Sequence, residues 1–241
     1  MLKIKNLTIE IEEHPIISGV TLNINPGEVH TLIGPKHSGK SAFVHSITGH
    51  PDIHLTKGNI TWKRKKLNEM SAQEILSQKI FITFQNPPEF PDFENWELIQ
   101  EFFGKTPQEI SELRLKYIAY CELLGLSQSH SKKRISGVAM TISEAKKNEL
   151  IHMLLFEPEL IILDEIDDGL EENEVEMIGK IIRNFLDIDS SRSCLIVTHN
   201  QKLLEILNPT TVHVMVSGKI KSFEDATVYK RIIENEYSKF S

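Results

Sequence analysis

The pattern of hydrophobic and polar positions predicts that strands and helices alternate along most of this chain. Predicted strands either alternate between apolar and polar residues or run continuously apolar, whereas predicted helices repeat apolar residues every three or four positions. The predicted strands cover residues 2–11, 20–24, 28–33, 59–62, 79–84, 160–164, 194–197 and 211–216. The predicted helices cover residues 40–48, 71–77, 109–124, 171–186, 201–207 and a C-terminal segment from about Asp225. This alternation is typical of an α/β fold.

Prolines interrupt the pattern in the middle of the chain. Pro87, Pro88 and Pro91 predict that residues 86–92 form an extended loop, because proline restricts its own backbone and that of the residue before it. The segment from Asn86 to Phe93 is also rich in proline, aromatic and acidic residues. If exposed, it is a plausible docking surface for another protein; the alternative is a rigid loop with Phe90 and Phe93 packed inward.

The chain is long enough for one packed α/β domain with a helical insertion, since it has 241 residues, of which 40% are hydrophobic. The signal is helical from residue 93 to residue 156. We therefore expect residues 1–241 to form a single domain, with a core of residues 1–92 and 157–241 and a helical subdomain of residues 93–156.

Charge and cysteine content narrow the class of protein. The net charge of -7 argues against nucleic acid as the main partner. The basic run Lys63-Arg64-Lys65-Lys66 is expected to form a solvated hairpin turn, with a basic contact to a partner protein as the alternative.

Cys121 and Cys194 lack metal-ligand spacing and are expected to be buried thiols, which fits a reducing compartment.

No apolar run approaches the roughly 20 residues that span a bilayer, and the N-terminus has no features of a signal or transit peptide. We therefore expect a cytoplasmic protein without direct membrane insertion. Such a chain does not transport a solute alone, although it could serve a transporter as a separate motor subunit.

The first chemical motif is the segment Gly34-Pro35-Lys36-His37-Ser38-Gly39-Lys40-Ser41, which matches the phosphate-loop pattern G-x-x-x-x-G-K-[ST]. It follows a predicted strand and precedes a predicted helix, as the motif requires. Backbone N–H groups in such a loop surround an anion, and the helix N-terminus adds partial positive charge. The motif predicts that Lys40 reaches the outer phosphates and that Ser41 holds Mg²⁺.

Two later strands end in residues that complete a nucleotide-hydrolysing site. The strand Leu160-Ile-Ile-Leu ends in Asp164 and Glu165, and the strand Ile196-Val is followed by Thr198 and His199. Open α/β sheets bind ligands at the carboxyl ends of their strands. We expect Asp164 to position Mg²⁺, Glu165 to polarise the attacking water, and His199 to contact the γ-phosphate.

Together these segments resemble the ATP-binding cassette (ABC) ATPases, and within them the SufC proteins of the Suf iron–sulfur cluster assembly system. The resemblance runs from Met1 to about Tyr237. Further stretches that carry it are Pro26-Gly-Glu-Val-His30, Phe84-Gln85-Asn-Pro87 (the Q-loop), Glu157-Pro-Glu-Leu160, Asp168-Gly-Leu170 (the D-loop) and Val212-His-Val214. The resemblance implies a RecA-like core sheet with an N-terminal antiparallel β-subdomain and a helical subdomain.

The resemblance also implies ATP and Mg²⁺ as cofactors and assigns residues to them. The implied nucleotide-binding residues are Gly34, Pro35, Lys36, His37, Ser38, Gly39, Lys40, Ser41 and Ala42, together with Thr141 and Ser143. The implied metal ligands are Ser41, Gln85 and Asp164. The implied catalytic residues are Glu165, His199, Lys40 and Gln85. His14 is the only candidate to stack on adenine, and an exposed hairpin position is the alternative.

The sequence departs from the family pattern in two places. The signature motif, usually Ser-Gly-Gly-Glu, is here Thr141-Ile142-Ser143-Glu144, which also reads as a helix-capping box. In the phosphate loop, Lys36 and His37 stand where the family usually has asparagine and glycine, and Ala42 replaces a threonine. Histidine tolerates left-handed backbone better than most residues, so the loop can still close. We expect ATP to bind, with slower closure and hydrolysis.

The implied mechanism is a nucleotide-dependent dimer that closes head to tail and moves a bound SufB/SufD-like scaffold. A nucleotide-binding regulatory subunit with little turnover and the motor subunit of an ABC transporter are the alternatives. The resemblance further motivates the hypothesis that Lys146 pairs with Glu165 or Asp167 in the resting monomer.

Overall fold

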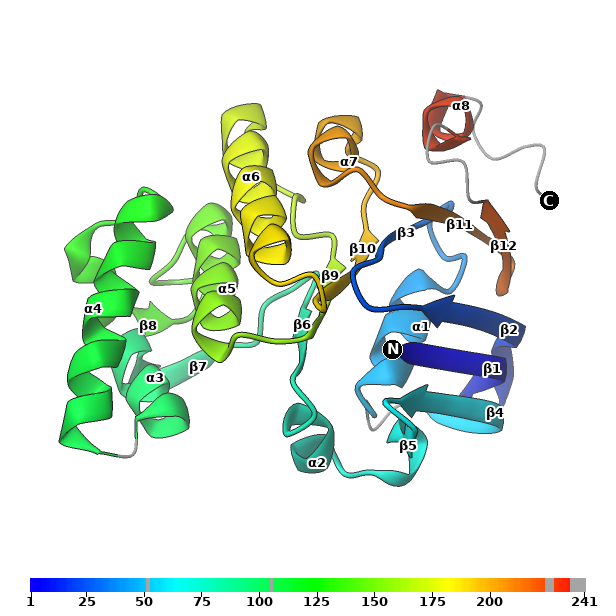
Figure 1. Cartoon of the computed structure of the whole chain (residues 1–241), viewed down its shortest axis with the longest axis horizontal. Coiled ribbons are helices and arrows are strands. Elements are labelled where there is room, and N and C mark those ends of the chain that lie inside the picture. The colour runs from blue at the N-terminus through cyan, green and yellow to red at the C-terminus, as the bar shows by residue number, and fades with distance from the viewer. Residues whose placement is uncertain (51–52, 105, 224–227, 235–241) are drawn as a thin grey trace.

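A computed structural model describes residues 1–50, 53–104, 106–223 and 228–234 of the chain (Figure 1). Its central element is a six-stranded sheet in the order β12-β11-β3-β10-β9-β6. The strands are β3 (Val29–Ile33), β6 (Ile80–Thr83), β9 (Leu160–Asp164), β10 (Ser193–Val197), β11 (Thr211–Val216) and β12 (Lys219–Phe223). All pairs are parallel except β11 with β12. The predicted α/β fold is confirmed.

The two faces of this sheet belong to two hydrophobic cores, because successive side chains of a strand point to opposite faces. The helices that flank the sheet are α1 (Lys40–Ile47), α6 (Glu172–Ile188), α7 (Gln201–Leu207) and α8 (Val228–Glu234). Leu32, Ile162 and Leu195 pack with α1, whereas Ile33 and Ile161 pack with α6, α7 and α8. Both faces of the parallel sheet are thus covered, which explains why its strands are almost continuously apolar.

A second, antiparallel sheet covers the far side of α1 in the order β2-β1-β4-β5 (Figure 1). Its strands are β1 (Leu2–Ile11), β2 (His14–Ile24), β4 (His54–Trp62) and β5 (Lys65–Lys66). Lys63 and Arg64 join β4 to β5 with positive φ angles of 47° and 72°, so the basic run forms the predicted hairpin turn. His14 is exposed at the start of β2, as expected for a hairpin residue.

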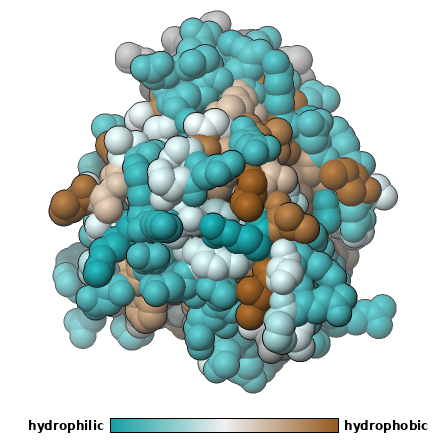
Figure 2. Space-filling view, turned by 90° about the vertical axis from the view of Figure 1, so that its left-hand side faces the viewer, coloured by the Kyte–Doolittle hydropathy of each residue, from teal (hydrophilic) through white to brown (hydrophobic). Residues whose placement is uncertain are grey.

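A helical group lies at one end of the molecule, at the left of Figure 1. It contains α3 (Asn95–Phe103), α4 (Pro107–Leu123) and α5 (Ile142–Phe156), with a two-stranded sheet of β7 (Phe90–Glu94) and β8 (Arg134–Ile135). The outward face of this group is mainly hydrophilic with scattered apolar side chains (Figure 2). Apolar residues scattered singly on a surface are ordinary and mark no site.

Shorter elements complete the fold and adjust the predicted boundaries. Helix α2 (Ala72–Leu76) is capped by Ser71, and 3₁₀ helices cover Leu67–Glu69 and Gln128–Lys132. The predicted start of the last helix, Asp225, lies outside the described residues. In the described part of the chain no helix is long and apolar enough to cross a membrane.

Two predictions in the middle of the chain were wrong in part, and one strand near the end of the chain was not predicted. The loop predicted over residues 86–92 already enters strand β7, which pairs with β8 from within the segment predicted as helical. Strand β12 was not predicted. Strand β7 pairs with a short strand that is distant in sequence, which local pattern does not reveal, whereas the Ser217-Gly218 turn between β11 and β12 was an available hairpin signal. The two cysteines are buried, as predicted.

Candidate active site

The predicted site residues lie at the carboxyl edge of the central sheet. Strand β3 leads into the phosphate loop, β9 ends at Asp164, β10 leads to His199, and β6 leads to Gln85. Val197 of β10 is in register with Asp164 of β9 on one side and with Leu32 of β3 on the other. Parallel strands that end in register bring their following loops to one edge, where sheets of this type bind ligands.

The phosphate loop is closed around its own lysine. Lys40 is buried at the first position of α1, and its Nζ donates hydrogen bonds of 2.9 Å to the carbonyl oxygens of Gly34 and Pro35. A Cβ at Gly34 would lie 2.2 Å from the carbonyl oxygen of Met215, so only glycine fits there. His37 has a φ of 63°, the left-handed conformation that its place in the motif demanded.

Asp164 has the environment of a metal ligand. It is buried, and neither carboxylate oxygen has a hydrogen-bond partner among the described residues. Burial, followed by the nearby charge of Glu165, raises its pKa to about 6. A buried acidic group without partners is costly, and a hard cation beside the phosphate loop would satisfy both oxygens. The donor set of Asp164 and the exposed Ser41 therefore fits Mg²⁺.

Glu165 is held by two contacts that come from two different strands. Its backbone N–H donates to the carbonyl oxygen of Val197 at 3.0 Å, and its Oε2 accepts a hydrogen bond of 2.7 Å from Gln85 Nε2. The Gln85 side chain is exposed, so it reaches Glu165 across the open edge of the sheet. The predicted base and the predicted Q-loop glutamine are thus in direct contact.

The pKa shifts of His199 and Lys40 indicate that both residues lie close to the charged groups of this site. Partial burial, followed by the positive charge of Lys40, lowers the pKa of His199. Burial also lowers the pKa of Lys40, while the carboxylates of Glu165 and Asp164 oppose that shift. The structure therefore brings Lys40, Asp164, Glu165, Gln85 and His199 together.

Thr141 and Ser143 lie at the start of α5. Thr141 caps the helix by accepting a hydrogen bond from the N–H of Glu144, whose side chain in turn accepts from the N–H of Thr141, so the predicted capping box is present. Ser143 Oγ donates to Glu174 Oε1 of helix α6 at 2.6 Å. The Ile142 side chain, which is 65% exposed, reaches to 2.9 Å from where a Cβ of Gly169 would stand.

The hypothesis about Lys146 was wrong. Lys146 does not pair with Glu165 or Asp167; its Nζ donates hydrogen bonds of 2.8 Å to the carbonyl oxygens of Phe84 and Gln85. The physical reason is the packing of α5 against the end of β6, which turns this lysine toward the loop that follows β6. Glu165 accepts from Gln85 instead.

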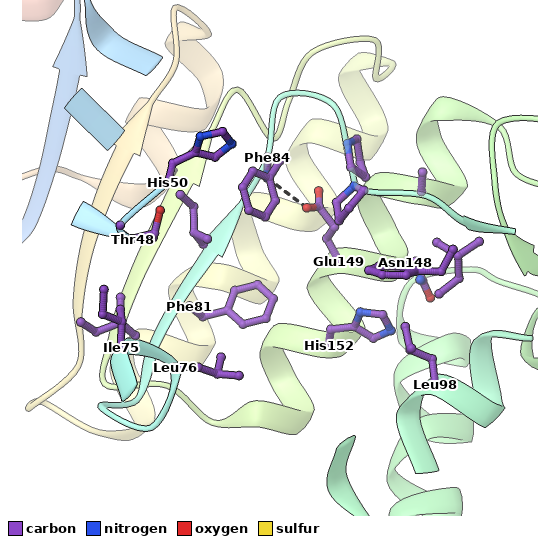
Figure 3. Close-up of a pocket in the computed structure, with 18 residues that line it drawn as sticks. Thr48, His50, Ile75, Leu76, Phe81, Phe84, Leu98, Asn148, Glu149 and His152 are labelled. Atoms are coloured by element: carbon purple, nitrogen blue, oxygen red, sulfur yellow. Dashed lines mark hydrogen bonds between the residues drawn. The ribbon is translucent and has the colours of Figure 1, made fainter. Parts of the chain in front are cut away.

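A groove beside the Q-loop was not found from the sequence. It has a volume of about 440 Å³ and mainly apolar walls, with Phe81, Phe84 and Leu76 on one side and Leu98 and His152 on the other (Figure 3). The loop predicted as a docking surface contributes Pro87, Pro88 and Phe90 to its walls. Phe90 and Phe93 are 39% and 46% exposed rather than packed inward.

Glu149 is the second feature that sequence reasoning missed. It lines the groove, and its Oε1 accepts a hydrogen bond of 3.0 Å from the N–H of Phe84 (Figure 3). Its Oε2 is buried without a partner among the described residues, and burial raises the pKa of this carboxyl to about 7. The spacing of Lys146 and Glu149, which places both on one face of a helix, was the available signal.

Comparisons with known proteins agree with this geometry. The model of the family described as "ABC transporter" matches residues 17–167. The chain is 32% identical to the "Probable ATP-dependent transporter SufC" of Escherichia coli (strain K12), over 98% of this chain and 97% of that protein. It is 36% identical to the "Iron-sulfur cluster assembly protein SufC" of Plasmodium falciparum (isolate 3D7), over 100% of this chain and 71% of that protein.

Solved structures show the same fold. A dimeric post-hydrolysis state of an ATP-binding cassette bound to ADP and Pi superposes with a TM-score of 0.77 at 18% identity, over 93% of this chain and 98% of that chain. The family match covers more than half of the sequence and includes both the phosphate loop and the adjacent acids Asp164 and Glu165. The chain therefore belongs to the ATP-binding cassette family of nucleotide-binding ATPases.

Proposed function

We propose that this chain binds ATP and Mg²⁺ and hydrolyses ATP, slowly, to drive a conformational change in an iron–sulfur cluster assembly scaffold of the SufB/SufD type. One observation carries the catalytic part: Gln85 Nε2 donates to Glu165 Oε2 next to the buried Asp164, whose carboxylate oxygens have no hydrogen-bond partner among the described residues. The relatives named SufC support the assembly part, because the chain aligns with one of them over nearly its whole length.

The roles follow from position and charge. Ser41, Asp164 and Gln85 would hold Mg²⁺, which, when bound, neutralises charge on the phosphate oxygens. The backbone from Gly34 to Ala42 would bind the phosphates. Lys40 and His199 would stabilise the charge that develops on the transferred phosphoryl group, and Glu165 would accept a proton from the attacking water. In this proposal residues 1–92 and 157–241 form the nucleotide-binding core, and residues 93–156 form the helical subdomain.

Closure would involve two copies placed head to tail. Each phosphate loop would face Thr141 and Ser143 of the other copy, together with its D-loop. Slow turnover is supported by Ile142, which fills the space that glycine leaves open in the usual signature, and by Ser143, whose hydroxyl is bonded to Glu174. ABC domains form such dimers, as the superposed structure with ADP and Pi illustrates.

The docking surface for the scaffold would be the groove beside the Q-loop. Its walls are mainly apolar, and they include Pro87, Pro88 and Phe90 of the exposed Q-loop segment. An apolar groove rimmed by polar residues is typical of a protein-interaction site. Movement of the scaffold in this groove would reach Gln85 directly, because Gln85 follows Phe84, which forms one wall. We further propose a cytoplasmic location and no nucleic-acid partner.

The altered signature favours a second candidate function, that of a regulatory nucleotide-binding subunit with little turnover. ATP turnover by the purified chain, with Glu165→Gln as the blank, decides between the two. Turnover above the blank supports the ATPase proposal. ATP binding without turnover, both alone and with co-purified partners, supports the regulatory subunit. Co-purification with an integral membrane protein rather than a scaffold would contradict the assembly role and indicate a transporter motor.

A further inference from the structure

Helix α5 holds the Q-loop through two charged side chains that lie one turn apart. Lys146 Nζ donates to the carbonyl oxygens of Phe84 and Gln85, and both distances are 2.8 Å. Glu149 Oε1 accepts from the N–H of Phe84 at 3.0 Å. One helix therefore holds three backbone polar groups of two successive residues, Phe84 and Gln85.

These two side chains are buried, which is unusual for their residue types. Lys146 is 1% exposed and Glu149 is 7% exposed. A helix that packs on a sheet normally places apolar side chains at such positions, because burying a charge is costly unless it is hydrogen-bonded and paired. The hydrogen bonds to the Q-loop backbone offset part of that cost and link the helix to the loop, although Glu149 Oε2 has no partner among the described residues.

The Q-loop backbone in turn determines where Gln85 lies. The Gln85 side chain is exposed, so packing does not fix its direction. Its Nε2 nevertheless donates to Glu165 Oε2 at 2.7 Å. A displacement of the Gln85 backbone by about 1 Å would lengthen this bond beyond hydrogen-bond range.

We propose that Lys146 and Glu149 are positioning residues for ATP hydrolysis: they fix the backbone around Phe84 and thereby hold Gln85 against Glu165. Neither side chain touches the nucleotide or the attacking water in this proposal. The inference rests on the proposed ATPase mechanism, in which Glu165 is the base, and adds that Gln85, besides its proposed place at Mg²⁺, orients Glu165 through their hydrogen bond.

A purely structural role is the competing explanation, because the same hydrogen bonds also satisfy loop groups that would otherwise be unpaired. The two explanations differ in whether the effect of substituting Lys146 or Glu149 depends on Gln85. A structural role changes stability and is independent of Gln85, whereas a positioning role acts through Gln85 and disappears when Gln85 is removed.

The test is a double-mutant cycle in the full-length chain with Lys146→Met and Gln85→Ala. Methionine is unbranched and only one heavy atom shorter than lysine, and it removes the charge and the donors. We expect Lys146→Met to lower kcat about tenfold, with KM for ATP and the ATP dissociation constant within about twofold of wild type. In the Gln85→Ala background the same substitution should have no further effect on kcat.

Lys79→Met is the matched control. Lys79 Nζ also donates to a backbone carbonyl, that of Phe156 at 2.9 Å, but it lies before β6 rather than at the Q-loop. We expect its kcat to stay within about twofold of wild type. A kcat for Lys146→Met equal to that of Lys79→Met, or effects of Lys146→Met and Gln85→Ala that multiply, would overturn the proposal.

Two further measurements keep the test decisive. If Lys146→Met does not fold, Glu149→Met enters the same cycle, with the same loss of kcat and the same masking by Gln85→Ala expected. The side-chain amide signal of Gln85 in an NMR spectrum gives a readout without turnover. It should move in Lys146→Met as it does in Glu165→Ala, and an unmoved signal would refute the inference. An inactive wild-type chain would refute the proposed ATPase, not this coupling.

Discussion

Ser143 Oγ donates a hydrogen bond of 2.6 Å to Glu174 Oε1, so the residue that replaces a signature glycine is bonded within its own chain. Lys147 donates to the same oxygen at 2.7 Å. The hydrogen bond from Lys147 and, to a smaller extent, that from Ser143 lower the pKa of Glu174 to about 2. The signature end of α5 is thereby fastened to helix α6, while Ile142 contacts the D-loop at Gly169.

Restoring the two glycines should therefore increase turnover. In the double variant Ile142→Gly/Ser143→Gly the backbone can approach a phosphate, and each added backbone N–H contact is worth a large factor in such sites. We expect kcat to rise roughly tenfold, measured against Glu165→Gln as the blank. Ser143→Ala is the control, since it removes one of the two hydrogen bonds to Glu174 Oε1, leaves that of Lys147 in place and keeps the bulk of Ile142. An unchanged kcat in a folded double variant would show that the signature does not limit the rate.

Substitutions of His37 test the shape of the phosphate loop. His37 is exposed with a φ of 63°, a conformation that costs a residue with a side chain about 1 kcal/mol. Glycine relieves this cost and loses a similar amount through the greater freedom of the unfolded chain. We expect His37→Gly to change the free energy of unfolding by less than about 0.5 kcal/mol, and His37→Val to lower it by about 1–2 kcal/mol. Urea denaturation of both variants measures this, and equal stabilities would contradict it.

A buried pair of histidines should make the chain sensitive to acid. His30 Nδ1 and His213 Nε2 are hydrogen-bonded at 2.8 Å, Glu28 bonds to His30 at 3.0 Å, and Ser222 bonds to His213 at 2.7 Å. Burial, followed by the charge of His30, lowers the pKa of His213 to about 3. The stability from neutral His213 is therefore present above the unfolded pKa of 6.5 and is lost as the pH falls below it.

Between pH 7 and pH 5 this loss should amount to about 2 kcal/mol of unfolding free energy. The unfolding free energy of His213→Gln should fall less than that of wild type over this pH range, and the two decreases should differ by about 2 kcal/mol. Denaturant titrations of wild type and variant at both pH values provide the comparison, in which other titrating groups cancel. Parallel curves for the two proteins would mean that His213 does not titrate on unfolding.

Glu149 should produce the opposite pH dependence. Burial raises its folded pKa from 4.5 to about 7, with the charge of Lys146 opposing the shift and that of Asp164 adding to it. A raised folded pKa means stability that is present below pH 4.5 and is lost as the pH rises through about 7. Glu149→Gln keeps an oxygen to accept from Phe84 and removes the charge. Between pH 5 and pH 8 the unfolding free energy of wild type should fall by up to about 2 kcal/mol relative to that of Glu149→Gln. Urea denaturation of both proteins measures this difference. A constant difference would contradict this.

Much of the fold and the contents of the site could be predicted from the sequence. The phosphate loop, the acids after β9 and the histidine after β10 follow apolar runs that are readable as buried parallel strands, so their meeting at one edge follows from strand direction. The strand pair β7–β8 could not be predicted, because its partners lie about 40 residues apart and are too short to show a period. The contacts of Lys146 and Glu149 were missed for a related reason. Their partners are backbone groups of the Q-loop, and backbone groups carry no sequence signal.

The strand order also places some site residues after inner strands of the sheet and one after an edge strand. Strands β3, β10 and β9 each have a hydrogen-bonded neighbour on both sides, so the phosphate loop, the two acids and His199 follow strands that cannot shift without disrupting two ladders. Among the described strands, β6 is at the edge of the sheet and pairs only with β9. Gln85 is thus the one member of the site that follows an edge strand. We therefore expect a force applied to the helical group to displace Gln85 more readily than the residues that follow the inner strands of the sheet.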